Sequence, residues 1–128
     1  MNSKELTNFL ADIGKSNKLI IVEGIKDKKA LNNLGIANYI VILKKPIYQV
    51  IEDIAKITDE AVILTDFDKK GKELYGKLNT GLQKFGVKVD HYYREWLQCN
   101  TKLSHIEGLR HYLGKLESKK ESRPVLNA

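Results

Sequence analysis

The feature that most constrains the fold is an alternation of short apolar runs with segments of helical periodicity along the 128-residue chain. Each run is only a few residues long and rich in β-branched residues, as expected for buried strands. The four runs are residues 19–22, 39–43, 61–66 and the less apolar 87–93. Strands joined through helices require right-handed crossovers, which make neighbouring strands parallel. We therefore predict one α/β domain with a mainly parallel four-stranded sheet and helices on both faces.

The segments between the runs carry apolar residues three and four positions apart, which predicts amphipathic helices. The predicted helices are residues 3–14, residues 27–34, a helix opened by Pro46, residues 69–85 and residues 104–116. The core of the domain is expected at about residues 18–93. The tail, residues 117–128, is polar and is expected to be frayed.

Composition narrows the classes of function. A single cysteine, Cys99, excludes an internal disulfide and a cysteine-rich zinc site. No apolar run approaches the roughly 20 residues that a membrane helix needs, and the acid-bearing N-terminus does not resemble a signal peptide. These features favour a cytoplasmic protein without a membrane partner. The net charge of +6 suits a polyanion such as nucleic acid, although lysine-rich surfaces are also common without one.

Acidic residues follow two of the predicted strands. Glu23 and Gly24 end the first strand, and Asp66 and Asp68 end the third. Ligands of parallel sheets gather at the carboxyl ends of the strands, and alternate residues of a strand point the same way. Both aspartates could therefore converge on one hard cation such as Mg²⁺, which would relieve their mutual repulsion. Asp68 could instead cap the helix that begins near Lys69, so both interpretations stay open.

The order of the acids excludes several α/β families. Response-regulator receivers carry their acidic pair after the first strand, and haloacid dehalogenase phosphatases carry DxD there. The chain also contains neither a P-loop nor a GxGxxG fingerprint. A glutamate-glycine pair after the first strand and DxD after the third resemble the Toprim domain of topoisomerases, primases and some nucleases. The matching segments are VEGIKD, residues 22–27, and LTDFD, residues 64–68.

The resemblance covers about residues 18–93 and is closest to small stand-alone archaeal Toprim proteins and to the catalytic half of nucleases that mature 5S ribosomal RNA. It implies a Rossmann-like fold, with Glu23 as general acid or base or as a metal ligand. It also implies that Asp66 and Asp68 bind Mg²⁺, with Mn²⁺ as a possible substitute. Gly24, Asp27 and Gly71 would support the motifs, although Asp27 could simply favour the helix dipole.

Basic residues are predicted at the same edge of the sheet as the acids. The candidate contacts to a nucleic-acid backbone are Lys26, Lys28, Lys44, Lys69, Lys70, Lys72 and Arg94. Lysines at a helix N-terminus oppose the helix dipole, so helix stability does not explain Lys69 and Lys70. A solvated surface remains an equally good explanation for the lysines. Arg94 could belong to a cluster at the sheet edge, Trp96 to the core, and Glu107 to a surface ion pair or to the metal site.

Two functions of different class follow. The first is a Mg²⁺-dependent nuclease that acts on structured RNA or DNA. The second is a non-catalytic nucleic-acid-binding or assembly subunit that retains the metal site. The substrate domains of the larger Toprim enzymes have no counterpart in these residues, so a protein partner could supply substrate recognition. No base-reading motif distinguishes RNA from DNA.

Overall fold

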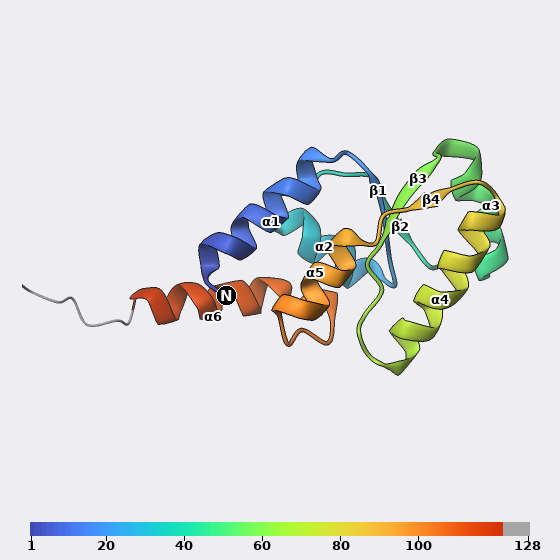
Figure 1. The fold of residues 1–128 in the computed structure, drawn as a ribbon. Coiled ribbons are helices and arrows are strands. Elements are labelled where there is room, and N and C mark those ends of the chain that lie inside the picture. Colours follow the sequence, from blue (N-terminus) through green and yellow to red (C-terminus); the bar gives the residue numbers. More distant parts are fainter. Residues whose placement is uncertain (122–128) are drawn as a thin grey trace, which may run out of the picture.

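The structure, a computed structural model, describes residues 1–121. Strands and helices alternate along most of the chain (Figure 1). The elements are α1 (Ser3–Lys15), β1 (Leu19–Val22), α2 (Ile25–Asn33), β2 (Ile40–Ile42), α3 (Ile47–Ile57), β3 (Glu60–Ile63), α4 (Lys69–Lys84), β4 (Lys88–Val89), α5 (Tyr92–Asn100), the 3₁₀ turn η1 (Ile106–Gly108) and α6 (Leu109–Glu121).

The four strands form one sheet in the order β2-β1-β3-β4, and every pair is parallel. In β1, Ile20 lies opposite Ile40 of β2 and Val62 of β3. This central position brings the carboxyl end of β1 beside that of β3. The predicted α/β fold with a parallel four-stranded sheet is therefore confirmed.

Helices cover both faces of the sheet, as predicted (Figure 1). Ile20 and Val22 pack into a cluster with residues of α1, α2, α5 and α6, whereas Leu19 and Ile21 pack with α3 and α4. All four side chains of β1 are buried because successive residues of a strand face opposite sides. Among the described residues, no helix is long and apolar enough to cross a membrane.

The fourth strand is much shorter than predicted. It ends at Val89, and residues 92–100 form α5. Asp90 Oδ1 accepts the Tyr92 N–H at 3.0 Å, which turns the chain out of the sheet. Tyr93 and Leu97, one helical turn apart, are then buried. The prediction of a strand over residues 87–93 was wrong beyond Val89 because this side-chain turn overrides the β-favouring tyrosines.

The C-terminal helix also differs from its prediction. Residues 117–121 continue α6 instead of belonging to a frayed tail, and residues 122–128 lie outside the described part of the chain. At its other end, the predicted helix begins later than Ser104, because His105 has an extended backbone and η1 starts at Ile106. The segment formed by residues 104–106 is called the clip below.

Candidate metal centre at the carboxyl edge of the sheet

The glutamate after β1 and the acidic segment after β3 meet directly. The Leu64 N–H donates to Ile21 O at 2.8 Å, so the two chains stay side by side beyond the end of β3. Glu23 Oε2 then accepts the Asp66 N–H at 2.7 Å. The predicted convergence of the two acidic motifs follows from the parallel register of β1 and β3. We call residues 65–68 the acidic loop.

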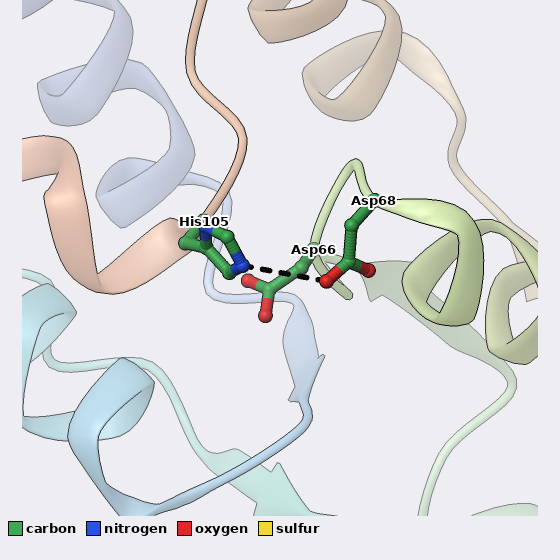
Figure 2. A group of neighbouring side chains, drawn as sticks. All are labelled: Asp66, Asp68 and His105. Atoms are coloured by element: carbon green, nitrogen blue, oxygen red, sulfur yellow. Dashed lines mark ion pairs between the residues drawn. The ribbon is translucent and has the colours of Figure 1, made fainter.

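The clip holds the acidic loop from the other side. The Phe67 N–H donates to Ser104 O at 2.8 Å, and the Ile106 N–H donates to Asp66 Oδ1 at 2.8 Å. Between these two bonds, His105 Nε2 lies 3.3 Å from Asp68 Oδ2 (Figure 2). Potential ligand atoms of Asp66, Asp68 and His105 all lie within 4.8 Å of one another. These three residues form the tightest group at the site.

Asp68 caps the following helix, as one of its two predicted roles requires, and keeps one carboxylate oxygen free of that role. Its Oδ1 accepts the Gly71 N–H at 2.8 Å, which makes Asp68 the N-cap of α4. Its Oδ2 faces His105, and its side chain is 42% exposed. A carboxylate has two oxygens with several acceptor positions, so capping the helix leaves Asp68 able to hold a cation.

Gly71 lets the first turn of α4 pack against the acidic loop. A Cβ at this position would lie 1.9 Å from the carbonyl oxygen of Asp66. The Thr65 hydroxyl donates to Gly71 O at 2.7 Å and joins the same two segments. The supporting role predicted for Gly71 therefore has a steric basis.

Gly24 and Asp27 shape the turn that presents Glu23. The Gly24 N–H donates to Asp27 Oδ2 at 3.0 Å, so the Asp27 side chain satisfies the N-cap N–H at the start of α2. Asp27 is buried, and this burial raises the pKa of its carboxyl group, as do the charges of Asp66 and Glu107. Asp27 is therefore a buried residue that supports the turn after β1, and it lies near Glu107.

The electrostatics of the site favour a cation. Partial burial raises the pKa of Glu23, and the negative charges of Asp66 and Asp68 raise it further, although the Asp66 N–H opposes both. Carboxylate oxygens are the preferred ligands of hard divalent cations. Asp66 and Asp68 therefore suit a divalent metal ion, and His105 adds a nitrogen donor. Glu23 lies outside this group and contacts it through the Asp66 N–H.

Arg94 has a different place from the predicted one. Its side chain is only 5% exposed, and its guanidinium donates to the carbonyl oxygens of Thr65 and Asp66. The rings of Phe67 and Tyr75 lie on it, with their centroids 4.6 and 4.7 Å away. The expectation that Arg94 contacts nucleic acid is therefore corrected: buried under the acidic loop, it supports the loop backbone.

The predicted lysines lie on the surface, at the edge of the sheet that carries the acids. Lys69, Lys70 and Lys72 occupy the first turn of α4 and are exposed. Lys26 and Lys44 are also exposed, and each follows the carboxyl end of a strand. Lys28, in the first turn of α2, is half-buried. Trp96 stacks on Phe9 with ring centroids 4.2 Å apart, in keeping with its predicted place in the core.

Sequence reasoning missed His105. The prediction placed this residue at the start of a helix and considered Glu107 for the metal site instead. The only signal was a histidine in the polar stretch before the apolar spacing of the last helix begins. Its contact with Asp68 spans 37 positions in the chain, so no local pattern could reveal it.

Comparison with known proteins places the chain in a family. No family model matches it. It is 34% identical over 119 residues to a UPF0292 protein of Methanosarcina acetivorans, a match that covers 91% of this chain and 83% of the relative. The chain belongs to the UPF0292 family. A UPF0292 protein of Pyrococcus horikoshii is 36% identical over 101 residues, and the match covers 76% of that relative.

A solved structure supports the fold of this UPF0292 protein. A protein from Aquifex aeolicus superposes with a TM-score of 0.72 at 27% sequence identity. The match covers 78% of this chain and 94% of the Aquifex chain. The structural likeness therefore covers most of this chain and is not confined to one motif. Neither comparison names an activity.

Proposed function

We propose that this UPF0292 protein is a Toprim-type, Mg²⁺-dependent nuclease that acts on structured RNA or DNA. The observation that supports this best is the 2.7 Å hydrogen bond from the Asp66 N–H to Glu23 Oε2. It joins the glutamate after β1 to the DxD segment after β3, so the two halves of the Toprim pattern share one site. This contact requires β1 and β3 to be neighbours in the sheet. A DxD sequence that occurred by chance elsewhere in the chain would not lie beside Glu23.

The donor set fits the proposed cation. Asp66 and Asp68 would hold Mg²⁺, with Glu23 beside them, because carboxylate oxygens match its preference. When bound, the ion would stabilise the negative charge that develops on the phosphodiester. Arg94 keeps the acidic loop in place through its bonds to Thr65 O and Asp66 O. The aspartates are therefore oriented before any substrate arrives.

Glu23 is the proposed proton-transfer group. Partial burial and the neighbouring carboxylates raise its pKa, which brings a carboxyl group closer to the range useful for general acid–base catalysis. Its carboxyl group would take a proton from the attacking oxygen or give one to the leaving oxygen. The exposed lysines at the start of α4 would hold neighbouring phosphates of the substrate strand.

The exposed lysines equally support the alternative, a nucleic-acid-binding subunit without catalysis. The test incubates the protein with labelled structured RNA and duplex DNA in Mg²⁺, Mn²⁺ or EDTA. We expect metal-dependent cleavage that Glu23→Gln and the double variant Asp66→Asn, Asp68→Asn abolish, while nucleic-acid binding persists. Glu52→Gln, at an exposed position of α3, is the matched control and should cleave normally. Salt-sensitive binding without product in any metal would support the binding subunit instead.

A further inference from the structure

We propose that His105 is a further ligand of this metal centre, beside Asp66 and Asp68, and that the centre therefore prefers a first-row transition cation such as Mn²⁺ to Mg²⁺. The inference rests on the metal site of the proposed function. It adds a ligand from a third part of the chain, beyond the strand ends that supply Glu23, Asp66 and Asp68.

The distances suit a shared ion. Three ligand atoms held about 2.1 Å from one octahedral cation lie about 3 Å apart when adjacent and about 4 Å apart when opposite. His105 Nε2 and Asp68 Oδ2 are 3.3 Å apart, and the ligand atoms of Asp66, Asp68 and His105 fall within 4.8 Å. In Figure 2 the imidazole and both carboxylates turn toward one another. A small inward movement of the side chains would therefore complete the coordination.

Backbone hydrogen bonds orient each ligand. Asp66 Oδ1 accepts the Ile106 N–H, and Asp68 Oδ1 accepts the Gly71 N–H. The second oxygen of each carboxylate can then turn to a cation, while the first stays fixed by an outer hydrogen bond, as is usual for metal ligands. The residues on either side of His105 are themselves bonded to the acidic loop, at Phe67 and Asp66. The clip thus fixes the imidazole at the site.

An ordinary surface ion pair explains this arrangement less well. The side chains of His105 and Asp68 are 49% and 42% exposed, and exposed pairs contribute little to stability. Such a pair does not require backbone bonds on both sides of the histidine.

The nitrogen ligand determines the preferred metal. Mg²⁺ favours an all-oxygen shell, whereas first-row transition cations accept imidazole nitrogen together with carboxylate oxygen. Two aspartates would neutralise the charge of the divalent cation, and a neutral imidazole would add affinity without adding charge. Removing the imidazole should therefore weaken Mn²⁺ binding much more than Mg²⁺ binding.

The experiment measures Mn²⁺ bound to the full-length protein by electron spin echo envelope modulation, which detects a directly coordinated imidazole nitrogen. We expect ¹⁴N modulation in the wild type and in His111→Gln, and its loss in His105→Gln. Calorimetry should show Mn²⁺ affinity reduced by about tenfold or more in His105→Gln. Mg²⁺ affinity should change by less than a factor of two. His111, exposed on α6, is the matched control.

The possible failures separate the two proposals. Mn²⁺ bound without ¹⁴N modulation, and with equal affinity in His105→Gln, would overturn the role of His105 and leave the carboxylate metal site intact. The double variant Asp66→Asn, Asp68→Asn should abolish the binding of Mn²⁺ and Mg²⁺. If it does not, or if neither cation binds to the wild type, both the role of His105 and the proposed metal-dependent function fail. Because His105 is exposed, its substitution should leave the thermal unfolding midpoint unchanged, which checks that the variant folds.

Discussion

At the scale of single residues, two positions support the acidic loop without offering a metal ligand or a proton-transfer group. Gly71 leaves space for the carbonyl of Asp66, and Arg94 satisfies two carbonyl oxygens of the acidic loop from below. Glu23, by contrast, touches the loop through one carboxylate oxygen at its partly exposed edge. Substituting the acids should therefore affect ion binding, whereas substituting their supports should affect the fold itself.

Gly71→Ala is expected to destabilise the protein by roughly 1–3 kcal/mol, because the new methyl group would collide with the backbone of Asp66. The same displacement should weaken Mn²⁺ binding. Gly76→Ala is the matched control on the same helix, since a Cβ there meets nothing within 4 Å. That control should be neutral or stabilise by about 0.5–1 kcal/mol. Urea unfolding measures both variants, and equal effects would contradict the close packing described here.

At the scale of elements, a charged cluster joins the strands at a distance from the site. Lys18, just before β1, lies 2.6 Å from Asp90 Oδ2 and 3.1 Å from Glu60 Oε1. Burial opposes ionisation of Asp90, but the hydrogen bonds from Lys18 and Tyr92 and the charges of Lys18 and His91 outweigh it. They hold the pKa of Asp90 below its ordinary value.

This depressed pKa sets the sign of a pH effect. A carboxyl group whose pKa is lower in the folded state stabilises the fold above its unfolded pKa, near 4, and this contribution disappears as the pH falls through the folded value. Asp90→Asn keeps an oxygen acceptor for the Tyr92 N–H and removes only the charge. We expect it to reduce the free energy of unfolding by about 1 kcal/mol at pH 7. The difference from wild type should shrink as the pH falls below the unfolded pKa and Asp90 takes up its proton, and a pH-independent difference would refute the linkage.

The elements also show where sequence reasoning succeeds. The strand at residues 19–22 and the acids that follow β1 and β3 were predictable because apolar runs and the residues directly after them are local features of the sequence. The helix α5 and the clip were not, because each depends on a tertiary contact. Asp90 turns the chain into α5, and His105 reaches Asp68 only after the chain has crossed β4 and α5. Arg94 was wrongly predicted to contact nucleic acid for the same reason, because the sequence around a single arginine does not show whether its side chain is buried.

At the scale of the whole molecule, the two edges of the sheet differ. Helix N-termini, the acids and the clustered lysines lie at the carboxyl edge, whereas the helices α1, α3 and α4 end at the opposite edge with Lys15, Lys56 and Lys84. Both sets of lysines are exposed and carry the same charge, so the two sets differ mainly in which edge of the sheet they occupy. A polyanion that reaches the candidate metal centre should meet only the first set.

Replacing Lys69, Lys70 and Lys72 together by glutamine should therefore weaken nucleic-acid binding. If each contacts one phosphate, the slope of log affinity against log salt should become shallower by about 2–3. The same replacement at Lys15, Lys56 and Lys84 removes an equal charge from the opposite edge and should leave the slope nearly unchanged. Fluorescence anisotropy across a salt series measures both. Equal losses in the two triple variants would show that binding follows net charge alone.

The long path from the acidic loop to the clip has a consequence for the protein as it is being made. Polypeptides emerge N-terminus first, and a nascent chain can build β1, β3 and their acids before Ser104–Ile106 has left the ribosome. Until then Asp66 lacks the N–H of Ile106, and Asp68 lacks its histidine neighbour. The candidate metal centre is thus among the last parts of the domain to be completed during translation.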